Sequence, residues 1–183
     1  ILCINIILHK MNIAVFIDGD NIPSDDIKKI VNEIRNHGRI VIANVYGDWS
    51  ETNMAKWMSV ASVNGINNIQ CDRISGKNST DIKLMLDMLK MLFTNDFIEC
   101  YFIVTSDSDY RHIVSEIKLK GKKCFCLGSE RTNTSLQNIC DKFIKIENLN
   151  KPSIPDNARP KTYINLDQKK YNTMFIDIRR LLE

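Results

Sequence analysis

Five aspartates stand where a protein could bind a divalent metal ion. Asp18 and Asp20 directly follow a short apolar run, and Asp107 and Asp109 follow another, while Asp81 opens a long apolar segment. Carboxylate oxygens that converge from three loops suit a hard cation such as Mg²⁺ or Mn²⁺. Such an ion could orient a phosphodiester, activate a water molecule and offset negative charge on the leaving oxygen.

Each of these aspartates also has a purely structural interpretation. Asp81 and Asp109 each begin a predicted helix, where a carboxylate can cap free N–H groups. Residues 18–21 could form only a turn. Convergence favours the metal site, because like charges placed close together repel, and a fold tolerates them mainly where a cation or a function requires them.

Three further residues, which are expected to lie close to these aspartates, could contact a nucleic acid. Lys77 could bind a phosphate, and Tyr46 or Trp49 could stack on a base, as aromatic side chains do in proteins that bind single strands. The structural alternative is that Lys77 is only exposed to solvent and that Tyr46 or Trp49 is only a half-buried cover of the core.

The elements that must position these residues alternate between strand and helix. Apolar runs and helical spacing predict strands over residues 12–17, 39–46, 67–71, 101–105, 122–127 and 142–146, and helices over residues 25–36, 52–62, 79–93, 110–120 and 136–140. Gly38 is expected to supply a left-handed helix cap, and Gly121 to end a later helix. The alternation predicts an α/β fold with a parallel sheet covered on both faces, whose ligands bind beyond the carboxyl ends of the strands.

Composition places the chain among ordinary globular proteins. Its 183 residues are 44% hydrophobic and 26% charged, enough for one domain with a sizeable core. The longest apolar stretch, residues 82–93, is interrupted by Lys83, Asp87 and Lys90, so we expect a cytoplasmic protein that does not span a membrane.

Several cysteines lie in apolar runs and none forms a Cys-x-x-Cys pair, which favours buried thiols over disulfides for Cys3, Cys71, Cys100, Cys124, Cys126 and Cys140.

The charge pattern divides the chain into a balanced body and a mildly basic tail. The net charge is +3, and residues 150–183 carry seven basic and four acidic side chains. This permits a polyanionic partner without requiring one. We expect an N-terminal extension (residues 1–11), a domain (residues 12–149), a proline-containing linker (residues 150–162) and a helical tail (residues 163–183).

Five segments, taken in order, resemble the successive motifs of the NYN domain in its LabA-like (DUF88) branch. They are residues 16–23, 46–50, 76–81, 106–110 and 140–143. The resemblance covers residues 12–149. It implies a three-layer α/β/α PIN-like fold with a central, mainly parallel sheet of five to six strands, and metal-dependent cleavage of RNA.

Carried over by position, the resemblance also implies a set of site residues. The metal-binding and catalytic residues would be Asp18, Asp81, Asp107 and Asp109, with Asn21 and Ser106 in support and Asp20 as a further candidate. Mg²⁺ or Mn²⁺ would be the cofactor, and single-stranded RNA the substrate of an endonuclease. Homo-oligomers are compatible with this hypothesis.

Two alternatives stay open at this stage. An Asp-x-Asp after a buried first strand is also the signature of haloacid-dehalogenase-like phosphatases, in which Asp18 would be the nucleophile and Asp20 the general acid. The other alternative is an NYN module that binds RNA without cleaving it, since metal ligands can persist where activity is negligible.

Overall fold

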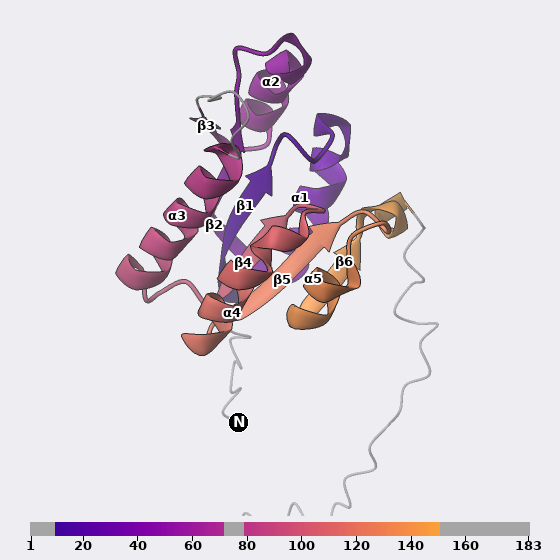
Figure 1. The fold of residues 1–183 in the computed structure, drawn as a ribbon. Coiled ribbons are helices and arrows are strands. Elements are labelled where there is room, and N and C mark those ends of the chain that lie inside the picture. Colours follow the sequence, from indigo (N-terminus) through magenta and orange to yellow (C-terminus); the bar gives the residue numbers. More distant parts are fainter. Residues whose placement is uncertain (1–9, 72–78, 151–183) are drawn as a thin grey trace, which may run out of the picture. The chain divides into compact units, whose positions relative to one another are not determined.

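A single parallel sheet organises the chain in this computed structural model, which describes residues 10–71 and 79–150. Its six strands run in the order β3-β2-β1-β4-β5-β6, and every neighbouring pair is parallel. The strands are β1 (Met11–Asp18), β2 (Gly38–Gly47), β3 (Asn67–Gln70), β4 (Cys100–Val104), β5 (Lys123–Gly128) and β6 (Lys142–Lys145). The predicted α/β class is confirmed. Because all the strands are parallel, their carboxyl ends lie along the same side of the sheet (Figure 1).

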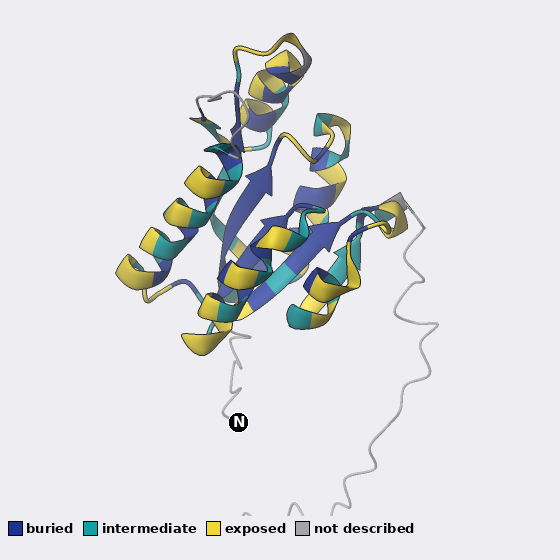
Figure 2. Cartoon of the chain, in the orientation of Figure 1, coloured by how far each residue is buried: buried dark blue, intermediate teal, exposed yellow. Residues whose placement is uncertain are grey.

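Helices cover both faces of this sheet and make three layers. One face packs against α1 (Ile27–Arg35) and α2 (Ala55–Val63), and the other against α3 (Ser79–Thr94), α4 (Arg111–Leu119) and α5 (Thr134–Ile139). Four 3-10 turns connect the elements: η1 (Ser24–Asp26), η2 (Thr52–Met54), η3 (Ser108–Tyr110) and η4 (Ile146–Asn150). The sheet is buried between the layers, whereas the outer sides of the helices are exposed (Figure 2).

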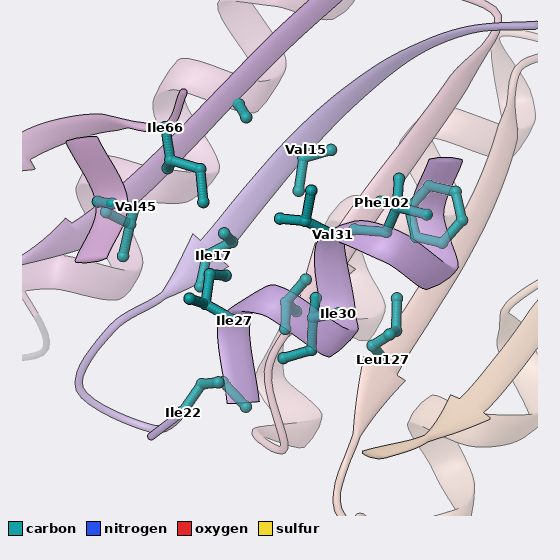
Figure 3. Packing of buried hydrophobic residues seen from close by; sticks show 14 of the residues in the cluster. Val15, Ile17, Ile22, Ile27, Ile30, Val31, Val45, Ile66, Phe102 and Leu127 are labelled. Atoms are coloured by element: carbon teal, nitrogen blue, oxygen red, sulfur yellow. The ribbon is translucent and has the colours of Figure 1, made fainter. Parts of the chain in front are cut away.

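β1 supplies both hydrophobic cores, because successive side chains of a strand point to opposite faces. Val15 and Ile17 belong to the core under α1 and α2, where Figure 3 shows them together with Ile27 and Val31 of α1. Phe16 belongs to the core on the other face. A strand apolar on both sides is typical of the centre of a parallel sheet.

The position of β1 also fixes the place where a ligand is expected. β1 lies between β2 and β4, with Ile17 opposite Val104. The chain crosses to β2 in one direction and to β4 in the other, which makes the β1–β4 boundary the topological switch point of the sheet. The segments that carry Asp18 and Asp107 therefore follow neighbouring strands.

One of the two predicted helix-ending glycines has a different role. Gly121 ends α4 with a φ of 70°, whereas Gly38 is not in the left-handed region and is the first residue of β2. A Cβ at Gly38 would collide with the carbonyl oxygen of Met11. Gly38 is therefore needed for the close approach of β1 and β2 rather than for a helix cap.

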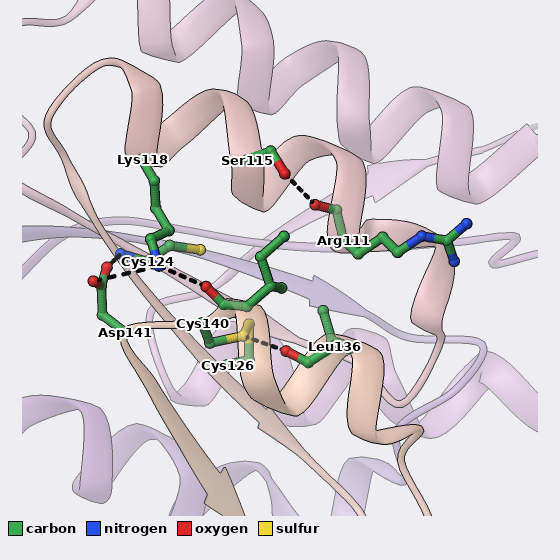
Figure 4. Close-up of a disulfide and its surroundings, with 9 residues drawn as sticks. Arg111, Ser115, Lys118, Cys124, Cys126, Leu136, Cys140 and Asp141 are labelled. Carbon is green, nitrogen blue, oxygen red and sulfur yellow. Dashed lines mark hydrogen bonds and ion pairs between the residues drawn. A yellow bond between two sulfur atoms is a disulfide. The ribbon is translucent and has the colours of Figure 1, made fainter.

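The cysteines follow the prediction only in part. Cys71, Cys100 and Cys124 are free and buried, and burial raises the pKa of Cys71 to about 11 and that of Cys100 to about 12. Cys126 of β5 and Cys140, however, form a disulfide (Figure 4), so the prediction of thiols is corrected for this pair. The return of the chain through α5 brings the two Cα atoms within 6.3 Å, although the two cysteines are 14 positions apart in sequence.

Several predicted features fall outside the part of the chain that the structure describes. These are Cys3, residues 1–9 of the extension, the linker beyond residue 150, and the tail at residues 163–183. Among residues 10–71 and 79–150, no helix is both long enough and apolar enough to cross a lipid bilayer.

Candidate metal centre

The last residue of β1 carries the most buried carboxylate of the candidate site. Asp18 is 0% exposed, and its Oδ2 accepts hydrogen bonds from Asn21 Nδ2 at 2.6 Å and from Thr105 Oγ1 at 2.9 Å. Its Oδ1 receives one backbone bond, from Asn21 N at 3.3 Å. Asn21 therefore supports Asp18, and Oδ1 keeps a lone pair for a further partner.

The hydroxyl of Tyr110 joins Asp18 to a second carboxylate. It lies 2.8 Å from Asp81 Oδ1 and 3.5 Å from Asp18 Oδ2. Since a phenol has one proton, the shorter contact is the donated bond and Asp81 receives it. Asp81 lies in the first turn of α3, and Tyr110 is fully buried at the end of η3. Three segments far apart in sequence thus meet around one hydroxyl group.

Asp107 and Asp109 lie on the loop after β4, close to this pair. The Oδ1 of Asp107 accepts a bond from the backbone N–H of Asp109 at 2.8 Å, which caps η3. The backbone N–H of Asp107 donates to Thr105 Oγ1 at 3.1 Å, so Thr105 connects this loop to Asp18. Asp109 is exposed and lies 3.8 Å from the guanidinium of Arg111.

Two residues named in support of the site take different positions. Ser106 holds the neighbouring loop, since its Oγ accepts from the backbone N–H of Ser129 at 3.0 Å. Asp20 is exposed and lines a hollow of about 370 Å³ beside the rim, together with Asn21. Ser106 therefore shapes the rim, and Asp20 faces solvent.

Accumulated negative charge and burial raise the pKa values of the central carboxylates. Burial raises the pKa of Asp18 to about 6; the hydrogen bonds from Asn21 and Thr105 oppose this rise, and the charges of Asp81 and Asp20 add to it. Burial also raises the pKa of Asp81, the bond from Tyr110 opposes that rise, and nearby aspartates reinforce it. Burial and the same carboxylates raise the pKa of Tyr110, which keeps its phenol protonated.

The donor set has the chemistry that a hard cation needs. All the candidate ligands are carboxylate oxygens, and a positive ion would relieve the charge that raises the pKa values of Asp18 and Asp81. Within residues 10–71 and 79–150, no group of three or more His, Cys, Asp or Glu side chains is arranged so that it could hold a metal ion. Mg²⁺ commonly takes only one or two protein carboxylates and completes its shell with water and substrate phosphates. The Asp18–Asp81 pair fits that mode of binding, and the four-aspartate set stays a prediction.

Comparison with known proteins identifies the family. The NYN domain matches residues 12–147, which is most of the chain. The chain belongs to the NYN domain family. The NYN domain is a PIN-like nuclease family, which agrees with the three-layer fold and with the resemblance seen in the sequence motifs.

The chain is similar to a protein and a solved structure whose descriptions state no function. Over 142 residues the chain is 30% identical to the uncharacterized protein MJ0482 of Methanocaldococcus jannaschii, an alignment that covers 73% of this chain and 55% of that protein. The chain thus spans about half the length of this curated relative. The crystal structure of VPA0982, a protein of unknown function from Vibrio parahaemolyticus, superposes with a TM-score of 0.65 at 18% identity, covering 77% of this chain and 96% of that one.

The residues expected to bind RNA in this NYN domain have different outcomes. Tyr46 is 0% exposed and its ring stacks on Phe16 in the core, so the structure gives it a packing role and no open face for a base. Trp49 is half-buried against the core under α1 and α2, and its role stays a prediction. Lys77 lies outside the described residues.

Thr105 and Tyr110 are the site residues that sequence reasoning missed. Both are buried and both donate to the central carboxylates. Thr105 is the first polar residue after β4, and Tyr110 ends one of the NYN-like motifs. The sequence positions of Thr105 and Tyr110 could therefore have marked them as candidate site residues. The partners of their hydroxyl groups could not be predicted, because these partners depend on tertiary packing.

Proposed function

We propose that this NYN domain is a metal-dependent ribonuclease that hydrolyses internal phosphodiester bonds of RNA. The observation that carries the proposal is the meeting of Asp18 and Asp81 around the Tyr110 hydroxyl, at the switch point of the sheet. Ligands of doubly wound sheets bind at this place.

In the proposed site, Asp18 and Asp81 would hold Mg²⁺ or Mn²⁺, and Asp107 and Asp109 would add negative charge from the loop after β4. The bound ion would supply charge stabilisation for the phosphate and would lower the pKa of a bound water.

The protein's own residues position the carboxylates. Asn21 and Thr105 fix the orientation of the Asp18 carboxylate through bonds of 2.6 Å and 2.9 Å. Tyr110 fixes Asp81 through its 2.8 Å bond. Mutation of residues that hydrogen-bond to metal ligands in this way typically lowers metal affinity or activity by about 10- to 100-fold.

Cleavage of a fluorescently labelled single-stranded RNA tests the proposal. We expect cleavage in Mn²⁺ or Mg²⁺ and none in EDTA. Asp18→Asn and Asp107→Asn should each lower the rate by about 10- to 100-fold. Asp96→Asn is the matched control, because Asp96 is an exposed aspartate between α3 and β4, at the opposite edge of the sheet, and it should cut like the wild type.

Other outcomes would point to the alternative functions. Tight RNA binding in EDTA without cleavage on addition of metal would indicate an RNA-binding module. A covalent phosphate trapped on Asp18 would indicate a phosphatase. Within the described part of the chain, no lysine contacts Asp18, and so no contact here favours the phosphatase.

A further inference from the structure

Three adjoining hollows form a groove between α1 and α2. The first is the rim hollow beside Asp20 and Asn21. The second has a volume of about 310 Å³ and shares Ser24 and Asp25 with the first. The third has a volume of about 630 Å³ and shares Asn64 with the second. Asn21, which donates to Asp18, lines the first hollow, so the groove begins beside the candidate metal centre and runs along α1 and α2.

The far end of the groove is strongly basic. Lys10, Arg35 and Arg39 line the third hollow, and no carboxylate lines it. None of these three cations forms an ion pair with a described acidic residue. Lys10 precedes β1, Arg35 ends α1, and Arg39 is the second residue of β2, which places the basic cluster at the sheet edge opposite Asp18.

The wall between the two ends is mainly apolar. Ile27, Val60 and Val63 line the second hollow, and Val63 is 87% exposed. Val31 and Ile66 reach the third hollow only at its base, because they are 3% and 4% exposed and belong to the buried core that Figure 3 shows. Such a wall can accept the faces of unpaired bases, while the cations contact the backbone.

The length of the groove corresponds to a short piece of one strand. Met11, which follows Lys10, lies seven residues before Asp18 in β1, a distance of about 23 Å at roughly 3.3 Å per residue. A stacked nucleic-acid strand advances about 3.4 Å per nucleotide, so about seven nucleotides would cover this span.

We propose that the groove between α1 and α2 is the binding track for single-stranded RNA whose scissile phosphate lies at the aspartates. This inference rests on the proposed function and deepens it. Arg35 and Arg39 bind phosphates about seven nucleotides from the cleavage site, since guanidinium groups match phosphate geometry in a bidentate manner. Lys10 adds a third positive charge at the same end.

The salt dependence of RNA binding, measured in EDTA so that no cleavage occurs, tests this track. For a single strand, log K falls with log[salt] with a slope of about −0.7 per phosphate contacted. In fluorescence anisotropy with a 15-nucleotide RNA, the double variant Arg35→Ser/Arg39→Ser should make the slope shallower by about 1.4. Wild-type affinity should rise with RNA length up to about seven nucleotides, and the double variant should lose that dependence.

A matched control removes the same charge from the opposite layer. Lys120 and Lys122 lie beyond α4 at the same edge of the sheet, where Lys120 covers the ring of Phe93 and Lys122 binds the carbonyl of Asp96. Lys120→Ser/Lys122→Ser should leave both the slope and the length dependence as in the wild type.

Three results would overturn the proposal: an unchanged slope in the arginine variant, an equal change in the lysine variant, or tighter binding of a polyglutamate of matched charge. Failure of the proposed function is seen separately, as absence of cleavage in Mn²⁺, because the binding measurement uses no metal.

Discussion

At the scale of single residues, the centre depends on buried hydroxyl groups as much as on carboxylates. Thr105 and Tyr110 direct their protons to Asp18 and Asp81, and each of these bonds has an ionisable acceptor. Hydrogen bonds to charged groups contribute more than neutral ones, typically about 1.5–3 kcal/mol. The two hydroxyl groups therefore hold together side chains whose charges would otherwise repel.

Removal of the Tyr110 hydroxyl should destabilise the protein. Tyr110→Phe keeps the buried ring and deletes the donor to Asp81, so we expect the free energy of unfolding to fall by about 1–2 kcal/mol in urea titrations. Tyr101→Phe is the matched control, because the buried Tyr101 hydroxyl has no hydrogen-bond partner among the described residues. The control should be neutral or slightly stabilising. Equal losses in both variants would contradict this account of Tyr110.

Asp18 should make the stability of the metal-free protein depend on pH. Its pKa is raised from 3.8 to about 6, so the folded state binds the proton more tightly than the unfolded state does. This contribution is fully present below pH 3.8 and is lost as the pH rises through about 6. Two pKa units correspond to about 3 kcal/mol.

Asp18→Asn removes this titration. In urea titrations without divalent ions, the wild type should lose up to about 3 kcal/mol relative to Asp18→Asn between pH 4 and pH 7. A difference between the two proteins that stays constant over this range would show that Asp18 does not titrate as its burial implies.

At the scale of elements, the turn after β1 holds the site against β2. The backbone N–H of Gly19 donates to the carbonyl oxygen of Tyr46 at 2.9 Å. A Cβ at Gly19 would lie 2.7 Å from that same oxygen, so the loop that carries Asp20 and Asn21 would have to move. The close approach of the two backbones therefore positions the ligand-bearing turn.

Gly19→Ala should consequently impair both stability and RNA cleavage. We expect a loss of about 1–3 kcal/mol in unfolding, as for other overpacked positions, and a cleavage rate well below that of the wild type. Gly121→Ala is the control. It introduces a methyl group into open space at a φ of 70°, and it should cost about 1 kcal/mol without reducing cleavage. Normal cleavage by Gly19→Ala would argue against a positioning role for the turn.

Local patterns in the sequence predict these elements well but predict their contacts less completely. The apolar run of β1 and the aspartates that follow it are sufficient to place Asp18 at the edge of a parallel sheet. The partners of Thr105 and Tyr110 are not predictable in this way, because they depend on how β4 lies beside β1 and how α3 packs beside α4. The Cys126–Cys140 disulfide is not predictable for the same reason, because the return of the chain through α5 determines its geometry. The burial of Tyr46 beside Phe16 is also set by tertiary packing, because strand side chains alternate between the two faces of a sheet and the motif does not show which neighbours they meet.

At the scale of the whole molecule, binding of a cation should stabilise the native state. A ligand that binds only the folded protein adds about 2.7 kcal/mol at a concentration 100 times its Kd. Mn²⁺ should therefore raise the melting temperature of the wild type, and Asp18→Asn and Asp81→Asn should abolish the shift. Asp96→Asn should retain it. A shift of equal size in all four proteins would place the bound ion elsewhere.

The central position of β1 also has a consequence for biosynthesis. β1 is translated well before its partner β4 and before Tyr110. Until then, this apolar strand lacks its neighbour on the β4 side of the sheet. A nascent chain that stalls before residue 110 would thus expose this segment to chaperones and proteases, and it would lack the Tyr110 hydroxyl that joins Asp18 to Asp81.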